Sequence, residues 1–298
     1  MNHSGTLSVL VANLSLGAGK AHDRMALARL WSELIADIRP EIVLTQEAGR
    51  GLSYHTTESD HDYLGRITTA LEKDYRVVFS PAVLLHPAKR ARMQFGEGEV
   101  WSQGLCLFLS TSADLQHLDL WTRSPLAHPM VDEMHLPRPA GSYLYQGDRS
   151  SEPRLVQVMR CRLFDEEILF VNVHLTTLKG ERENHPEIDR EAEELRGLQL
   201  AEIEGAVKAL AGPETLVLIA GDFNAGREEL LRHSLTAALA PLVDGKTRPA
   251  GRISVDNILL SRDHRFRQVR VSILDDRRMS PLIECGADHY PLLVELKV

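Results

Sequence analysis

Short polar clusters that end apolar runs are the residues of this chain whose types suit chemistry. In chain order they are Asn13 in VLVANLSLG, Gln46-Glu47 in IVLTQEAG, His174 in LFVNVHLTT, Asp222 and Asn224 in LVLIAGDFNAG, Asp256-Asn257 in ISVDNILLS, and Asp288-His289 in CGADHYPLLVEL. Polar groups at the end of a buried strand cost desolvation free energy unless they bind something. Carboxylates, amides and histidines in this order predict a site for a hard cation and a phosphate.

Spacing within the clusters indicates which side chains could act together and which would have separate roles. Asp222 and Asn224 lie two apart, so both side chains can face one way on an extended segment. Asp288 and His289 are adjacent and must point apart, so they would have different roles. Asp256, about 30 residues earlier, could hold the second imidazole nitrogen of His289 and fix its tautomer.

Each cluster alone also has an ordinary structural explanation. Gly, Asp and Asn are common turn residues, a single glutamate commonly faces solvent, and His174 or a His–Asp pair can be purely structural. The hypothesis of a site rests on all the clusters occurring at comparable strand ends.

Apolar periodicity predicts the elements that must position these residues. Residues 7–15 and the run EIVLTQE read as buried strands, and residues 22–38 between them carry a helical stripe, which gives a β-α-β unit. RLVQVMRCRLF and EILFVNVHL predict an antiparallel pair, and Glu47 is expected where its strand ends. Residues 186–210 predict the longest helix, and EELLRHSLTAAL predicts another. Further strands are expected at SQGLCLFLS, LVLIAGDFN, ISVDNILLS, RQVRVSILD and LLVELKV.

Residues 122–153 form the least regular part of the sequence and read as a long loop insertion. The segment contains five prolines, at positions 125, 129, 137, 139 and 153. With Trp121, His135, Tyr143 and Tyr145, it could be a lid that selects substrates or a disordered insertion.

Composition bounds the class of protein. The chain has 298 residues, 43% of them hydrophobic, which suffices for one large α/β domain or two small ones. A net charge of -8 excludes a polyanion binder held by bulk charge alone. Cys106, Cys161 and Cys285 are far apart and predict reduced thiols. We see neither a signal peptide nor the roughly 18 apolar residues that a membrane span needs. We therefore expect a cytoplasmic protein without stable membrane insertion.

The clusters, taken together, resemble the endonuclease/exonuclease/phosphatase superfamily, the deoxyribonuclease I-like proteins. The match extends from Asn13 to His289, and the QE, GDFN and DH elements carry most of it. The resemblance implies an α/β fold: a four-layer α/β sandwich of two mostly antiparallel β-sheets, packed face to face with helices outside. Residues 1–298 would form a single domain of this type.

The resemblance also implies roles for individual residues. Glu47 resembles the principal magnesium ligand, with Asn13 and Asp288 near the metal. Oxygen ligands without a cysteine cluster favour Mg²⁺, with Mn²⁺ as a substitute, over zinc.

The remaining clusters resemble the groups that act on the phosphate. Asp222 corresponds to the residue that orients or deprotonates water, and Asn224 to one that holds the phosphate. His289 corresponds to the histidine that contacts the scissile phosphate, paired with Asp256. His174 stands where the nucleases and sphingomyelinases carry a histidine.

The function favoured is divalent-metal-dependent hydrolysis of a phosphodiester, by a nuclease or nucleotide phosphodiesterase. Its partner would be a nucleic acid or nucleotide, bound with help from Lys179 and Arg182. Other basic candidates are Lys89, Arg90, Arg92, Arg248 and Arg252. The alternatives are a phospholipid or inositol phosphate phosphoesterase and a silent binding module on the same fold. Protein partners are not readable from the sequence, and 5% aromatic residues disfavour a platform for several stacked bases.

Overall fold

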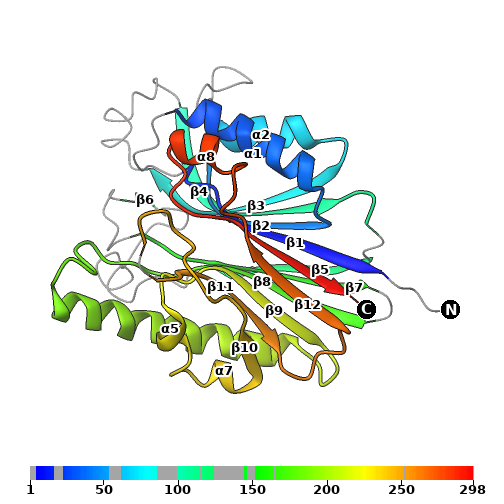
Figure 1. Ribbon diagram of the computed structural model, residues 1–298, viewed down its shortest axis with the longest axis vertical. Coiled ribbons are helices and arrows are strands. Elements are labelled where there is room, and N and C mark those ends of the chain that lie inside the picture. Colours follow the sequence, from blue (N-terminus) through cyan, green and yellow to red (C-terminus); the bar gives the residue numbers. More distant parts are fainter. Residues whose placement is uncertain are drawn as a thin grey trace.

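Two β-sheets pack face to face between two layers of helices in the computed structural model (Figure 1). The structure describes residues 5–16, 23–53, 62–85, 99–113, 116–123, 144–145, 152–163, 166–251 and 253–297. The first sheet has the order β12-β13-β1-β2-β4-β3-β6 and the second β10-β11-β9-β8-β7-β5. Neighbouring strands are antiparallel except for β1/β2, β3/β6 and β8/β9. The predicted fold class, a sandwich of two mostly antiparallel sheets with helices outside, is therefore confirmed.

The elements have the following bounds. The first sheet contains β1 (Thr6–Asn13), β2 (Ile42–Ser53), β3 (Tyr75–Leu85), β4 (Glu99–Ser110), β6 (Leu144–Tyr145), β12 (Gln268–Ile273) and β13 (Leu292–Lys297). The second contains β5 (Gln116–Arg123), β7 (Val156–Leu163), β8 (Glu166–His174), β9 (Leu216–Asp222), β10 (Leu239–Pro241) and β11 (Asp256–Ser261). The helices are α1 (Arg24–Ile38), α2 (Tyr63–Leu71), α5 (Pro186–Leu210), α6 (Arg227–Leu230), α7 (Leu235–Ala238) and α8 (Ser280–Glu284).

Alternating side chains on β1 show how the layers share the core. Val9 and Val11 face the apolar core between the sheets, whereas Leu10 and Ala12 face the cluster beneath α1 and α2. A strand buried on both faces needs apolar residues at every position, which explains the uninterrupted run that predicted it. A third cluster lies between the second sheet and α5.

The chain ends meet in the first sheet, since β1 pairs antiparallel with β13 from Thr6↔Lys297 to Val11↔Leu292. The predicted β-α-β unit is present as β1-α1-β2, and β7 and β8 form the predicted antiparallel pair.

One predicted helix is wrong. EELLRHSLTAAL was expected to be continuous, but α6 and α7 are separate helices joined by a turn, and Leu239 already belongs to β10. The pairing of Leu239 with Ser261 of β11 holds this segment extended, so tertiary pairing overrides the local helical pattern.

Several expectations lie outside the described residues. These are the basic residues Lys89, Arg90, Arg92 and Arg252, together with His135 and Tyr143 and most of the 122–153 segment. The side chains of Trp121 and Tyr145 are likewise outside the described part, although their backbones belong to β5 and β6. Among the described helices, none combines the length and apolar character needed to cross a bilayer.

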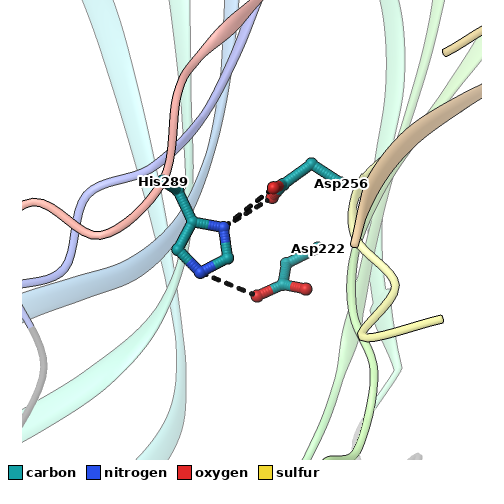
Figure 2. A group of neighbouring side chains, drawn as sticks. All are labelled: Asp222, Asp256 and His289. Atoms are coloured by element: carbon teal, nitrogen blue, oxygen red, sulfur yellow. Dashed lines mark hydrogen bonds and ion pairs between the residues drawn. The ribbon is translucent and has the colours of Figure 1, made fainter. Parts of the chain in front are cut away.

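Strand register brings the polar clusters to one end of the sandwich. Asn13 of β1 pairs with Gln46 of β2. In the other sheet, Asp222 of β9 lies between His174 of β8 and Asp256 of β11, whose carboxylate is drawn with that of Asp222 in Figure 2.

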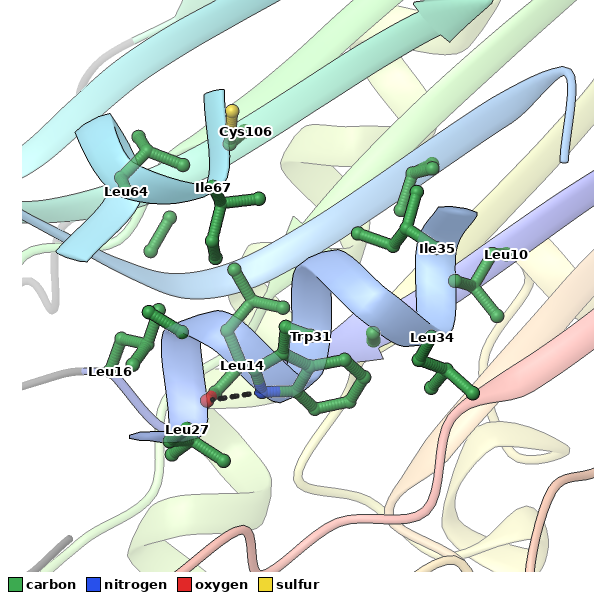
Figure 3. Packing of buried hydrophobic residues seen from close by; sticks show 14 of the residues in the cluster. Leu10, Leu14, Leu16, Leu27, Trp31, Leu34, Ile35, Leu64, Ile67 and Cys106 are labelled. Carbon is green, nitrogen blue, oxygen red and sulfur yellow. Dashed lines mark hydrogen bonds between the residues drawn. The ribbon is translucent and has the colours of Figure 1, made fainter. Parts of the chain in front are cut away.

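Trp31 on α1 fixes the segment that follows β1. Its side chain is fully buried, and its indole Nε1 donates a 3.0 Å hydrogen bond to the carbonyl oxygen of Leu14 (Figure 3). Asp23 caps the start of α1 by accepting from the amide of Ala26, and Arg39 ends the helix in the left-handed conformation before Pro40. The helix layer is thereby tied to the chain just beyond Asn13.

We expect Trp31→Phe to lower the free energy of unfolding by about 1–3 kcal/mol, because it leaves the buried Leu14 carbonyl without its donor. Urea unfolding at equilibrium measures this change. Met25→Leu, a change at an exposed position on the same helix, serves as control and should shift stability by less than about 0.5 kcal/mol. Wild-type stability in Trp31→Phe would show that the hydrogen bond contributes nothing.

Candidate active site

A β-bulge aims Glu47 into the site. The register between β2 and β4 shifts between Thr45 and Ala48, and Glu47 has a φ of 49°. A bulge inserts an extra residue and redirects its side chain, and the left-handed conformation is uncommon for a residue other than glycine. The expectation that the strand ends at Glu47 is therefore wrong, since β2 continues past the bulge to Ser53.

Asn13 connects Glu47 to the second sheet. Its Nδ2 donates to Asp222 Oδ2 at 3.1 Å and lies 3.3 Å from Glu47 Oε1. Asn13 and Asp222 are both buried, with 2% of each residue exposed, so water competes little for this contact. One amide therefore links carboxylates that come from opposite sheets.

Asp288 lies at the more open side of the site. Its Oδ1 accepts a 2.8 Å hydrogen bond from Ser15 Oγ, and its Oδ2 pairs with Arg248 Nη2 at 2.5 Å. Burial would raise the pKa of Asp288, but the positive charges of His289 and Arg248 hold it below the usual range. Ser15 was not among the predicted site residues, because one serine after a strand carries no sequence signal of its own.

His289 is held between two buried aspartates (Figure 2). Its Nδ1 lies 2.8 Å from Asp256 Oδ2, and its Nε2 lies 3.7 Å from Asp222 Oδ2. Burial alone would lower the pKa of His289, but the charges of Asp256 and Asp222 raise it to about 10. The imidazole therefore carries both protons at neutral pH, and the contact expected with Asp256 is present.

Two acids of the site hold their protons more tightly than usual. Burial, with the charges of Asp288 and Glu152, raises the pKa of the half-buried Glu47 to about 7. Burial also raises the pKa of Asp222, although the charge of His289 opposes the shift. Both shifts are those expected where several carboxylates share a poorly hydrated space.

Asp222 and Asn224 are arranged by a turn. Asn224 has a φ of 49°, its backbone amide donates to Asp222 Oδ1 at 2.9 Å, and its Nδ2 donates to the Leu175 carbonyl at 3.0 Å. The extended geometry expected for this pair is therefore wrong. The turn nevertheless keeps both residues in the site and leaves Asp222 Oδ2 facing Asn13, His174 and His289.

A buried arginine that the sequence analysis missed contacts His174. Arg154 Nη1 lies 3.0 Å from His174 Nδ1 and 2.9 Å from Glu152 Oε1, while His174 Nε2 lies 3.6 Å from Asp222 Oδ2. Only 3% of Arg154 is exposed, and its Nε has no acceptor among the described residues. Its one sequence signal is a charge directly before the apolar run LVQV, just after the proline-rich segment.

The loop after β8 brings Arg182 to the site. Arg182 Nη2 donates to the carbonyl oxygen of Asn224, and Lys179 is exposed on the same loop. The buried Arg196 of α5 supports this loop through Glu181 at 2.8 Å and pairs with Glu229 at 2.6 Å. The structure therefore places Arg182 against the GDFN turn, three residues after Lys179 in the chain.

Two groups of residues could be considered for a metal ion. Asp222, Asp256 and His289 offer ligand atoms within 4.8 Å of one another. A histidine must lose a proton to bind a metal, however, and Asp256 stabilises the doubly protonated ring. Glu47, Asn13 and Asp288 offer oxygen atoms, and the charge of Asp288 contributes to the raised pKa of Glu47. This second group fits a hard divalent ion better.

Comparison with known proteins identifies the fold. No family model matches the chain, and a search of curated proteins found no match. A solved endonuclease/exonuclease/phosphatase family protein from Leptotrichia buccalis is 14% identical, with a TM-score of 0.62 over 98% of this chain and 100% of that chain. The human Nocturnin catalytic domain, solved with a bound sulfate anion, is 15% identical, with a TM-score of 0.61 over 100% of this chain and 95% of that chain. TDP2 from Caenorhabditis elegans is 14% identical, with a TM-score of 0.59 over 99% and 75% of the two chains. The chain therefore has the endonuclease/exonuclease/phosphatase fold, as the resemblance implied.

The raised pKa of Glu47 predicts how stability depends on pH without metal. The carboxyl titrates near 4.5 when unfolded and near 7 when folded. Its protonated form therefore stabilises the fold fully below about pH 4.5, and this contribution is lost as the pH rises through about 7. Glu47→Gln keeps a neutral side chain, so its stability relative to wild type should rise from pH 5 to pH 8, by at most about 1.4 kcal/mol per pH unit.

Urea unfolding in EDTA across this range measures the difference. Glu33→Gln, at an exposed position of α1, is the matched control and should show no such trend. A difference between Glu47→Gln and wild type that stays constant with pH would contradict the raised pKa.

Proposed function

We propose that this protein is a divalent-metal-dependent phosphodiesterase, most simply a nuclease or nucleotide phosphodiesterase. The observation that carries the proposal is that a group suited to a metal ion and a positively charged histidine lie on opposite sides of Asp222. On one side lies the acidic group of Glu47, Asn13 and Asp288, and on the other lies the protonated His289. A phosphate ester bound between them would meet a cation on one side and a hydrogen-bond donor on the other.

Glu47 would bind the metal ion, with Asn13 and Asp288 beside it. An Mg²⁺ or Mn²⁺ ion there would neutralise charge on the phosphate and help the leaving oxygen depart. Ser15 and Arg248 fix the carboxylate of Asp288 from two directions, so it is positioned before any ligand arrives.

Asp222 would orient the attacking water and accept its proton. The Asn224 amide fixes Oδ1 of this carboxylate, while Oδ2 remains directed at the centre of the site. A buried carboxylate with a raised pKa is a stronger base than an exposed one, which suits proton transfer near neutral pH.

His289 would donate its Nε2 proton to a phosphate oxygen as negative charge develops. Asp256 accepts from Nδ1, which keeps the donor pointing into the site. Asn224 and His174 would contact the same phosphate from the adjacent strand ends.

Arg154 and Arg182 supply further positive charge. The unpaired Nε of Arg154 beside His174 is a buried donor suited to a phosphate oxygen. Arg182 at the GDFN turn, with Lys179 on the same loop, would bind a neighbouring part of the substrate. The similarly folded Nocturnin domain was solved with a bound tetrahedral anion, sulfate.

Hydrolysis by the purified protein tests the proposal directly. We expect cleavage of bis-p-nitrophenyl phosphate that is abolished by EDTA and restored by Mg²⁺ or Mn²⁺. Single- and double-stranded DNA, RNA, sphingomyelin and inositol phosphates complete the panel. Preference for a nucleic acid would support a nuclease. Preference for a lipid or inositol phosphate would instead support a phospholipid or inositol phosphate phosphoesterase. Undiminished cleavage in EDTA would exclude the metal-dependent mechanism.

Substitutions at the three central groups should separate chemistry from folding. Glu47→Gln, Asp222→Asn and His289→Ala should each lower kcat about 10²–10⁴-fold, because each removes the metal ligand, the base or the proton donor. Thermal unfolding should stay cooperative in all three. The exposed Glu33→Gln and Asp37→Asn on α1 repeat two of these changes as controls. Full activity in any central variant would remove that residue from the mechanism.

A further inference from the structure

An open hollow of about 310 Å³ adjoins the candidate active site. One wall consists of residues 248–251, which precede β11. The other consists of Ile283 on α8, with Ala287 and Asp288 between α8 and β13. The hollow shares Asp288 with the proposed metal site, so a ligand in the hollow would lie next to that site.

Arg248 connects the hollow to the site electrostatically. Its Nη2 pairs with Asp288 Oδ2 at 2.5 Å and its Nε contacts the Asp288 carbonyl oxygen at 3.3 Å. Two contacts fix the orientation of the guanidinium, and 30% of the Arg248 side chain remains exposed.

The lining favours a flat, weakly polar group. Apart from Arg248 and Asp288, the side chains that the described residues contribute to the lining are those of Pro249, Ala250, Ile283 and Ala287, none of which can form hydrogen bonds. An inositol ring would place hydroxyl groups against these residues without partners, which costs free energy. A nucleobase instead has apolar faces that fit between aliphatic walls, with the charged side chain of Arg248 in the same lining.

We propose that this hollow binds the nucleobase of the nucleotide whose phosphate occupies the active site. The inference rests on the proposed function, because it takes the substrate to be a nucleotide or nucleic acid phosphodiester. It adds a binding site for one base and names the residues that form it. The specificity of the protein would then arise partly from residues 248–251, away from the catalytic groups.

Equilibrium titration calorimetry in Mg²⁺ tests the proposal without requiring turnover. The probes are adenosine 5′-monophosphate, adenosine 3′-monophosphate and the base-free ribose 5-phosphate. We expect the better adenosine nucleotide to bind wild-type protein at least fivefold more tightly than ribose 5-phosphate, the lower end for stacking of one base.

Two variants fill the hollow from its opposite walls: Ala250→Phe at an exposed position and Ile283→Trp at a half-buried one. Each should remove the advantage of adenosine and leave the Kd of ribose 5-phosphate within twofold. Ala237→Phe makes the same change at an exposed alanine of α7, whose carbonyl oxygen accepts from Arg262 just past the far end of β11, and should retain the advantage. Thermal unfolding confirms that all three variants are folded.

The outcomes separate this inference from the proposed function. No adenosine advantage in wild type, or an advantage that survives in both filled variants, would overturn the hollow as a base site. Failure to bind any of the three probes would overturn it too. An advantage lost only in the filled variants, in a protein that hydrolyses no phosphodiester, would uphold the base site and refute the proposed enzymatic activity.

Discussion

The hydrogen bond between Asn13 and Asp222 is the contact on which the rest of the site depends. Asn13 ends a strand of one sheet and Asp222 ends a strand of the other, so this 3.1 Å contact sets how the two sheets align at that end. Glu47 is placed relative to Asn13, and His289 relative to Asp222. If the two sheets were aligned differently, their apolar faces could still pack together, but the polar residues of the two sheets would not meet in one site. The apolar layers supply the stability that makes so much polar burial tolerable.

Backbone strain is concentrated in the same place. Ser15, Glu47 and Asn224 all have left-handed φ angles, and each lies in the site. Such conformations persist only where surrounding structure determines them. Here Glu47 lies within the paired strand β2, and Ser15 and Asn224 follow the ends of β1 and β9. Trp31 on α1 holds the segment after β1, which contains Ser15, through its hydrogen bond to the Leu14 carbonyl oxygen. Unfavourable backbone conformations therefore lie beside the groups that would bind ligand, in a region whose carboxylates also repel one another.

What the sequence could predict follows from the range of the interactions involved. Apolar runs and their periodicity are local, so the β1-α1-β2 unit and α5 could be predicted from them, whereas the layered sandwich was implied by the family resemblance. The contact of His289 with Asp256 followed from residue types at two strand ends. The bulge at Glu47 could not be predicted, because it depends on how β2 pairs with β4. Arg154 was missed because a charge before a strand usually faces solvent, and its burial becomes visible only once His174 and Glu152 lie beside it.

The pairing of β1 with β13 has a consequence for how the protein is made. Ser15 and Asp288, which share a hydrogen bond in the site, are 273 residues apart in the chain. During synthesis β1 emerges early, and its edge stays unpaired until β13 is translated. Contacts of such long sequence separation form slowly, and the open edge is a place where nascent chains can associate. The site would therefore be completed only after translation of the last strand, so partly synthesised chains would be inert.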